Sequence, residues 1–458
     1  MEKILPTSPT VAATNLVKVP NLDKVKKLPK NWLETELGKV SEIIRGVSYN
    51  KNQAFSFGNE NSAYIIRGGN IQDGKIDFDT GDNVFIDKKI VNQIQFLKEH
   101  DVVIVGSTGS KKLIGKAGIA IKDYDSVAFG AFLMLLRTKS INKKFHAYFF
   151  QTKFYRNLIS ELAGGVNINN IRKEYLENMA FPLPPLPEQE RIVAKLDLLF
   201  AQHEKIKTSL EKIPQILKDF RQQILTQAVT GKLTEEWRKG KDLGEWKETK
   251  VGNFVEEVKE RVDPEVTPLQ KYVGLEHIQK DGGLIGVGIS SDVKSLKTLF
   301  KKDDVLYGKL RPYLNKHFVV DFDGICSTDI LAYRARNVYY AHFFNFYLGE
   351  SNVILALNSL SKGINLPRIS SRDLNNLMIR IPKQIEIEEI VSRVESLFSK
   401  IDAIELRYQK LKEKIDQLPQ TILHKAFKGE LVPQLPTDGD AKDLLKEILA
   451  LKKEGKKK

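Results

Sequence analysis

Cysteine is nearly absent from this sequence: Cys326 is the one cysteine among 458 residues. A single thiol cannot form a disulfide within the chain, and it supplies too few ligands for a cysteine-based zinc site. The longest apolar run, residues 127–136, is about half as long as a membrane-spanning helix. We expect no signal peptide, because Pro6 and Pro9 interrupt the first apolar stretch. These absences predict a protein with no membrane segment that works in a reducing compartment, the cytoplasm.

Motifs for catalysis and for cofactor binding are also missing. Residues 109–116, G-S-K-K-L-I-G-K, resemble a phosphate-binding loop, but the spacing is wrong and Ala117 replaces the Ser or Thr that would hold magnesium. The 7 histidines show no metal-ligand spacing. Residues 327–329, S-T-D, have no identifiable base nearby and are interpreted as a turn. We therefore predict no catalytic, cofactor-binding or metal site, and a chain that binds or organises other molecules.

The charge is strongly unbalanced. The chain carries 72 basic and 58 acidic residues, a formal net charge of +14. Such an excess favours a polyanionic partner such as nucleic acid. A basic housekeeping protein is the alternative that charge alone leaves open. The basic residues are spread along the sequence, so the charge does not locate a binding surface.

The sequence contains an internal repeat at a constant offset. Ile192 and Gly231 recur 198 positions later as Ile390 and Gly429, and the register holds without a gap across about fifty residues. Within each copy the apolar residues recur in alternating steps of four and three, which is the spacing of a heptad seam. His203 is the one polar seam position. The apolar seam residues are Ile192, Leu196, Leu199, Ile206, Leu210, Ile213, Leu217, Phe220, Ile224, Ile390, Val394, Leu397, Ile401, Ile404, Tyr408, Leu411, Ile415, Leu418 and Ile422.

Each copy predicts one long helix of about 33 residues. Gly231 and Gly429 follow the seams as stop signals. Pro214 and Pro419 fall inside the helical patterns, and each is expected to kink its helix or to remove one backbone hydrogen bond.

The segments before the two helices also resemble each other. Residues 32–38, W-L-E-T-E-L-G, match residues 246–252, W-K-E-T-K-V-G. Short β-rich runs broken by Gly, Asn and Asp dominate both segments. We therefore predict an α+β fold with a pseudo-twofold internal repeat, in which two similar sheet-rich domains are separated by two long helices that form an antiparallel coiled coil.

The predicted domain organisation follows from this order. It comprises an N-terminal extension (1–30), a first sheet-rich domain (31–181), a first spacer helix (182–235), a second sheet-rich domain (236–380), a second spacer helix (381–435), and a C-terminal helix with a Lys-rich tail (436–458).

Several motifs together resemble the specificity subunit of type I restriction–modification enzymes. Residues 181–193, F-P-L-P-P-L-P-E-Q-E-R-I-V, and residues 228–233, A-V-T-G-K-L, resemble the family's conserved region. Residues 379–391, I-R-I-P-K-Q-I-E-I-E-E-I-V, are a weaker second copy. Residues 68–76, G-G-N-I-Q-D-G-K-I, and 306–314, L-Y-G-K-L-R-P-Y-L, resemble motifs of the family's target-recognition domains. The resemblance covers residues 31 to about 450.

The resemblance implies a role in a larger complex. The two target-recognition domains would each read one half of a bipartite sequence in double-stranded DNA, while the helices would set the gap and dock two methylation subunits. Two motor–nuclease subunits would complete the complex. S-adenosylmethionine, ATP and Mg²⁺ are expected on those partner subunits, and this chain is expected to bind no cofactor and to catalyse no reaction.

The candidates for DNA contact are polar and basic residues in Gly-punctuated loops. Arg and Lys can pair with guanine, and Ser and Thr with several bases. Phosphate contacts or a solvated loop remain the alternatives. The candidates are Ser107, Thr108, Ser110, Lys111 and Lys112 in the first domain and Lys309, Arg311, Tyr313 and Lys316 in the second.

Two other functions compete with this interpretation. A stand-alone coiled-coil adaptor could bind DNA or protein without methylase partners, although the duplicated order of domain and helix disfavours it. A nuclease or methyltransferase acting alone is disfavoured because the catalytic motifs are missing.

Overall fold

The computed structural model describes residues 28–81, 83–110, 113–164 and 170–455, so the predicted N-terminal extension lies almost wholly outside the described residues. The chain divides into two compact units. The first combines Met1–Lys207 with Glu413–Lys458, and the second is Thr208–Lys412. Each unit contains one sheet-rich head and parts of two helical segments from different regions of the sequence. Within the described residues, no helix is long and apolar enough to cross a membrane.

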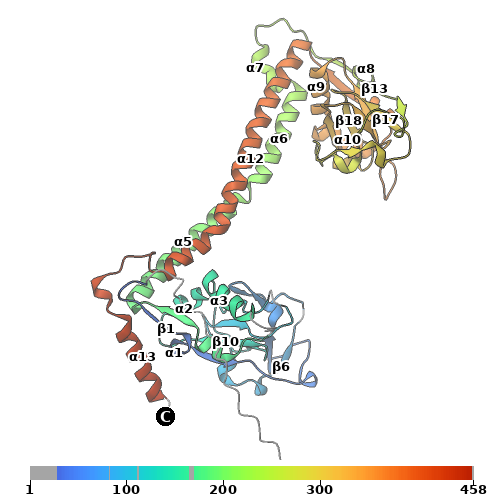
Figure 1. Cartoon of the computed structure of the whole chain (residues 1–458). Coiled ribbons are helices and arrows are strands. Elements are labelled where there is room, and N and C mark those ends of the chain that lie inside the picture. The colour runs from blue at the N-terminus through green and yellow to red at the C-terminus, as the bar shows by residue number, and fades with distance from the viewer. Residues whose placement is uncertain (1–27, 82, 111–112, 165–169, 456–458) are drawn as a thin grey trace, which may run out of the picture. The chain divides into compact units, whose positions relative to one another are not determined.

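The head of the first unit is built on small sheets (Figure 1). Its four-stranded antiparallel sheet has the order β2-β10-β7-β8, formed by Glu42–Arg45, Leu133–Arg137, Val102–Val105 and Ala117–Ile119. A three-stranded sheet has the order β6-β3-β9, formed by Phe85–Asp87, Ser62–Ile66 and Val127–Phe129. The remaining pairs are β1–β11 (Leu33–Glu36 and Ala180–Leu183) and β4–β5 (Ile71–Gln72 and Lys75–Ile76). The helices of this head are α1 (Leu37–Val40), α2 (Lys143–Phe149), α3 (Lys153–Gly164) and α4 (Lys173–Glu177).

The head of the second unit repeats this plan. Its four-stranded sheet has the order β13-β21-β18-β19, formed by Glu256–Glu257, Ile330–Arg334, Val305–Gly308 and His317–Val319. A five-stranded sheet has the order β14-β17-β20-β15-β16, formed by Arg261–Val262, Lys297–Phe300, Gly324–Cys326, Lys271–Val273 and Gly288–Ile289. Strands β12 (Lys247–Lys250) and β22 (Met378–Ile381) form a pair. The helices are α8 (Val251–Phe254), α9 (Val338–Leu348), α10 (Ser351–Leu360) and α11 (Ser371–Asn375).

The two heads share both topology and specific contacts. In each, an antiparallel sheet is accompanied by a parallel pair, β3 with β9 and β15 with β20. Arg137 pairs with buried Asp101 in the first head, and Arg334 pairs with buried Asp304 at the same place in the second. The internal repeat seen in the sequence is therefore a repeat of fold.

The central strands are apolar on both faces, which explains their continuous apolar sequence. Along β7, Val102 and Ile104 pack into one hydrophobic cluster, while Val103 and Val105 pack into another. Successive side chains of a strand point to opposite faces, so a strand covered on both sides needs apolar residues throughout.

The first copy of the repeat does not form one helix, which corrects the prediction of a single spacer helix over 182–235. It forms α5 (Leu186–Leu210) and α6 (Ile213–Thr230), followed by the short α7 (Glu235–Arg238). Pro214 stands in the first turn of α6, where its missing N–H costs nothing, and it prevents α5 from continuing. The second copy forms one helix, α12 (Gln384–Phe427), with Pro419 inside it.

Each unit packs its two helical segments against its own head. In the first unit, Leu196 of α5 and Ala426 of α12 share one core. In the second, Ile224 of α6 and Val394 of α12 share another, and the two helices lie side by side next to α9 (Figure 1). The first residues of one helix meet the last residues of the other, so within each unit the two helices run antiparallel.

Burial along the predicted seam is uneven. Ile206 and Ile404 are 44% and 46% exposed, and Phe220 and Leu411 are exposed as well, which corrects the expectation that these positions are buried. Heptad spacing identifies one face of a helix, but burial also requires an element opposite that face. Burial is not confined to the seam residues nearest the heads, since Leu210 in the middle of the first copy is buried as well.

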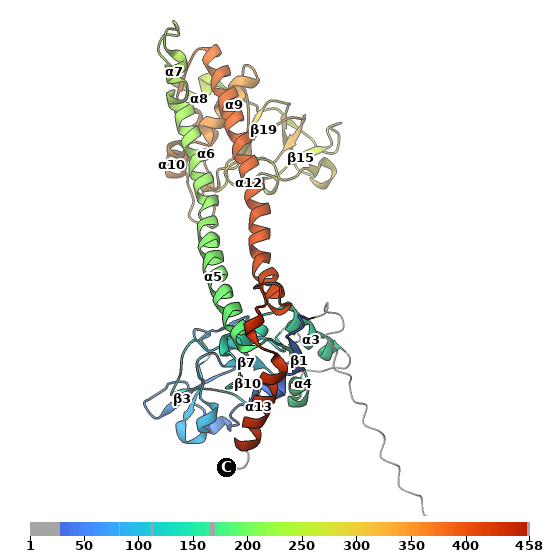
Figure 2. The ribbon, with the colours of Figure 1, turned by 90° about the vertical axis from the view of Figure 1, so that its left-hand side faces the viewer.

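The C-terminal segment belongs to the first unit. Helix α13 (Ala441–Gly455) lies against the first head, where the Lys452 ammonium donates to the Gly38 carbonyl at 3.0 Å (Figure 2). Arg191 of α5 pairs with buried Asp438 just before α13, with nitrogen–oxygen distances of 2.6 and 2.8 Å. This bidentate pair ties the C-terminal segment to the start of α5.

Candidate nucleic-acid interface

The first predicted DNA loop begins at one end of the four-stranded sheet in the first head. The register pairs Met134 with Arg45 and Leu133 with Val105, so the end of β2, the start of β10 and the end of β7 lie together. The Ser107 and Gly106 N–H groups both donate to the Phe132 carbonyl, at 3.0 and 2.9 Å. The start of the loop is therefore held by backbone hydrogen bonds.

The second predicted loop starts at the equivalent point of the second head. Lys309 N–H donates to the Asp329 carbonyl at 2.8 Å, just as Gly106 donates to Phe132. The Lys309 carbonyl in turn accepts from Ile369 N–H at 3.1 Å. The loops that begin at Gly106 and Lys309 therefore leave the same end of the equivalent sheet in the two heads.

In the first head the candidate hydroxyl residues are half-buried. Thr108 Oγ1 accepts from Ser110 N–H at 3.3 Å, which forms a local turn, and Ser107 forms a β-bridge with Asn170. Lys111 and Lys112 lie outside the described residues.

In the second head the candidates divide into outward and inward groups. Arg311 and Tyr313 are exposed, and Arg311 has a positive φ of 53° while its N–H donates to the Pro367 carbonyl at 2.7 Å. The Lys316 ammonium instead donates to the Leu275 carbonyl at 2.6 Å. The Lys316 side chain thus closes a loop within the head.

A hollow beside the first loop contains residues that the sequence did not indicate. It has a volume of about 590 Å³. Its lining includes Arg45, Ser107, Phe132, Asn170, Arg172 and Glu174. Apart from Ser107, no local motif marks the residues of this lining, because only the strand register and the Ser107–Asn170 bridge bring them together.

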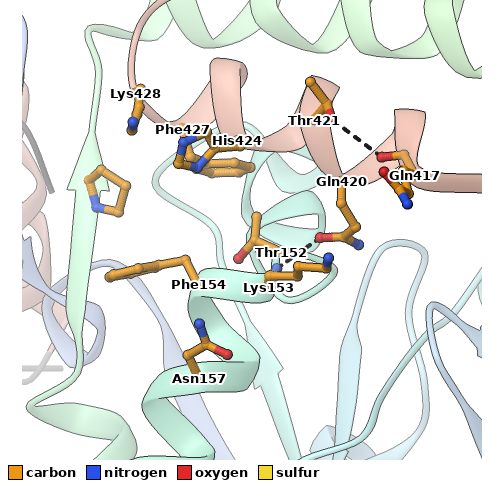
Figure 3. A pocket seen from close by; sticks show the side chains of 11 residues that line it. Thr152, Lys153, Phe154, Asn157, Gln417, Gln420, Thr421, His424, Phe427 and Lys428 are labelled. Carbon is orange, nitrogen blue, oxygen red and sulfur yellow. Dashed lines mark hydrogen bonds between the residues drawn. The ribbon is translucent and has the colours of Figure 1, made fainter. Parts of the chain in front are cut away.

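A separate groove lies where α3 meets the last turns of α12 in the first unit (Figure 3). It has a volume of about 450 Å³, and Phe154 and Phe427 contribute to its apolar lining. Gln420 crosses the junction: its Oε1 accepts from Lys153 N–H and its Nε2 donates to the Gln151 carbonyl, both at 2.9 Å. In the second unit Gln222 donates to the Gly349 carbonyl at 3.1 Å in the same way. None of the described DNA candidates lines this groove.

Groups that could support other chemistry are buried or dispersed. In the part of the chain that the structure describes, no cluster of three His, Cys, Asp or Glu side chains could hold a metal ion. Burial raises the pKa of the Cys326 thiol to about 12, so the thiolate is scarce at neutral pH.

Comparison with known proteins identifies the class. Residues 29–215 match the family model described as the type I restriction modification DNA specificity domain. The chain is 35% identical over 434 residues to the type I restriction enzyme StySPI specificity subunit of Salmonella potsdam, covering 89% of this chain and 91% of that protein. It is 33% identical over 429 residues to the EcoKI specificity subunit of Escherichia coli K12, with the same coverage of 89% and 91%. This chain belongs to the family of type I restriction enzyme specificity subunits.

Solved structures show the same fold. The HsdS subunit from Thermoanaerobacter tengcongensis aligns with a TM-score of 0.62 and 18% identity, over 90% of this chain and 100% of that one. A chain from a structure of a type I restriction–modification system, described in terms of complex assembly and conformational transition, aligns with a TM-score of 0.61 and 19% identity, over 88% and 99%.

Proposed function

We propose that this specificity subunit reads a bipartite target in double-stranded DNA, one half with each head. The observation that carries the proposal is the repeated sheet end, at which Gly106 and Lys309 begin polar loops held by equivalent backbone bonds. Two similar surfaces with different side chains suit two half-sites of different sequence. The net charge of +14 favours the phosphate backbone, which supplies affinity, while base contacts supply specificity.

The helices are proposed to dock the methylation subunits and to set the gap between the half-sites. Exposed apolar side chains on these helices, Ile206 and Ile404 among them, support a docking role, because large apolar groups favour burial against a partner. The antiparallel pairing seen within each unit supports a coiled coil built from both copies of the repeat.

The subunit is proposed to act within a complex that contains two methylation and two motor–nuclease subunits. Catalysis, together with S-adenosylmethionine, ATP and Mg²⁺, belongs to those partners in this proposal. The cytoplasm is the proposed compartment, because the proposed substrate is DNA.

A domain exchange tests the proposal. The chain is produced in a host together with its methylation subunits, and modified adenines are mapped by single-molecule sequencing. We expect a bipartite motif with a fixed gap. Replacing residues 31–181 with the first head of another family member should change one half of the motif and leave the other half and the gap intact. A motif without two halves, or an exchange that alters both halves, would refute the proposal.

A further inference from the structure

We propose that Phe132 is a specificity-determining residue that contacts the methyl group of a thymine in the first half-site, and that Arg45 and Arg172 hold the flanking phosphates. This inference rests on the proposed function and assigns the hollow at the sheet end of the first head to one chemical feature of the DNA.

The Phe132 side chain is presented on a rigid backbone. It is 71% exposed although it directly precedes the buried strand β10. Its carbonyl accepts two hydrogen bonds from the β7 loop, and Leu133 N–H donates to the Gly130 carbonyl at 2.8 Å. The backbone that carries the ring is held by these bonds and loses little conformational freedom on binding, which favours a recognition role.

The polar groups around Phe132 suit a duplex. Arg45 and Arg172 are exposed, and neither forms an ion pair within the described residues, whereas nearby Lys173 pairs with Glu177 at 3.4 Å. Unpaired guanidinium groups match phosphate in charge and geometry. Glu174 is the carboxylate that lines the same hollow. Side chains such as Phe read thymine through its methyl group in the major groove.

The second head supports this assignment because its scaffold is the same and its side chains differ. Asp329 occupies the place of Phe132, since its carbonyl accepts the equivalent bond from Lys309. Arg368, which bridges Leu310 as Asn170 bridges Ser107, pairs with Asp329 at 3.4 Å. At this position the first head has the apolar Phe132, and the second head has the Asp329–Arg368 ion pair. Different side chains on the same scaffold suit two heads that read different sequences.

The experiment uses the full chain assembled with its methylation subunits. The target is first mapped in cells, and binding to target duplexes is then measured by fluorescence anisotropy, with each thymine of the first half-site replaced in turn by deoxyuridine. We expect one replacement to weaken wild-type binding about three- to fivefold, the loss of one buried methyl group, and to leave the binding of Phe132→Ala unchanged. Phe132→Ala should also relax the mapped motif at that position only.

Four further variants sharpen the test. Arg45→Gln and Arg172→Gln should weaken binding to all duplexes and lower the slope of log affinity against log salt by about 1 each, without changing the motif. Phe132→Leu keeps an apolar side chain and should retain part of the thymine dependence. Ile121→Ala, at the opposite end of the same sheet and 77% exposed in the native chain, should bind like the wild type.

The outcomes separate the two hypotheses. If the wild-type complex methylates a bipartite motif but no thymine-to-deoxyuridine exchange distinguishes it from Phe132→Ala, the role of Phe132 is refuted and the proposed function stands. If Phe132→Ala weakens all duplexes equally, Phe132 is not a specificity determinant. If the wild type yields no bipartite motif, the proposed function itself fails.

Discussion

The Trp32 indole N–H donates to Oε2 of Glu188 at 2.9 Å, and in the second unit Trp246 donates to Oε2 of Glu386 at 3.2 Å. Both carboxylates are fully buried in the first turn of a long helix. Trp32 directly precedes strand β1, and Trp246 directly precedes strand β12. Each head is thereby locked to the helix that follows it in the sequence.

The same tryptophans also contact the end of the other helical segment. A Cβ placed on Gly231, after α6, would lie 3.0 Å from the Trp246 ring, and one on Gly429, after α12, would lie 3.3 Å from the Trp32 ring. Both glycines have a positive φ, which suits the end of a helix. The repeated arrangement of Trp, Glu and Gly is therefore completed in the first unit only by the C-terminal part of the chain.

Loss of the buried carboxylate should destabilise the first unit. In Glu188→Ala, the Trp32 N–H would remain buried without an acceptor, and we expect a cost of about 2–3 kcal/mol in the free energy of unfolding. Hydrogen exchange of residues 31–181 measures this. Glu190→Ala, exposed in the same turn, is the matched control and should change stability by less than about 0.5 kcal/mol. Equal effects of the two variants would contradict the lock.

Substitutions along α5 should differ in cost according to the burial of the side chain. Leu196→Ala removes a fully buried side chain and should lower the free energy of unfolding by about 2–5 kcal/mol, whereas Leu198→Ala, at a position 52% exposed, should lower it by less than about 0.5 kcal/mol.

Ile206→Glu and Ile404→Glu should leave thermal melting of the isolated chain nearly unchanged but weaken assembly with the methylation subunits. Size-exclusion chromatography of the co-expressed subunits tests this, and full assembly of both variants would contradict docking at these residues.

Acidification should destabilise the first unit through His146. Burial lowers the pKa of His146 to about 3, and its Nε2 lies 2.6 Å from Ser41 Oγ. The unfolded histidine, with a pKa near 6.5, takes up a proton that the folded one does not, so stability falls as the pH drops below about 6.5. We expect a loss of about 1.4 kcal/mol per pH unit between about pH 6 and 4. His146→Gln should show a smaller slope in hydrogen exchange, and an unchanged slope in this variant would contradict the assignment to His146.

The Gln420 bridge at the α3–α12 junction should stabilise the first unit measurably (Figure 3). Gln420→Ala removes two hydrogen bonds to the backbone of the head and should cost about 1–2 kcal/mol. Faster exchange of the amides at the start of α3 would report it. Gln417→Ala, exposed one turn earlier on the same helix, is the control. An unchanged exchange rate in Gln420→Ala would show that the apolar contacts alone hold this junction.

Helix length should affect the gap in the DNA target. A heptad inserted both after Lys207 and after Lys412, where the two compact units meet in the sequence, keeps the apolar stripe in phase and adds about 10 Å of helix. We expect a folded complex whose mapped motif has a gap longer by one to three base pairs, or one that no longer methylates its target. Insertions of four residues should disturb folding more. Methylation of the original motif at full rate by the heptad variant would refute the spacing role.

The repeat, the two sheet-rich heads and the helical nature of both seams could all be predicted from the sequence. These properties depend on local spacing: the offset of 198 residues, steps of four and three, and short β-rich runs between turns. The sequence also located both polar loops, because Gly-punctuated runs after buried strands mark the sheet end. It did not reveal Arg45, Phe132 and Arg172 as neighbours, because strand register and a long-range bridge bring them together.

Which segments pack on each other depends on long-range contacts that the sequence pattern does not reveal. The end of α12 and helix α13 belong to the first unit, although they lie more than two hundred residues from its head in the sequence. The periodicity of Ile206 and Ile404 matches that of Leu196 and Val394, yet the first two are exposed and the last two are buried. A heptad pattern specifies the face of a helix through local geometry, whereas burial depends on what the rest of the chain places opposite that face.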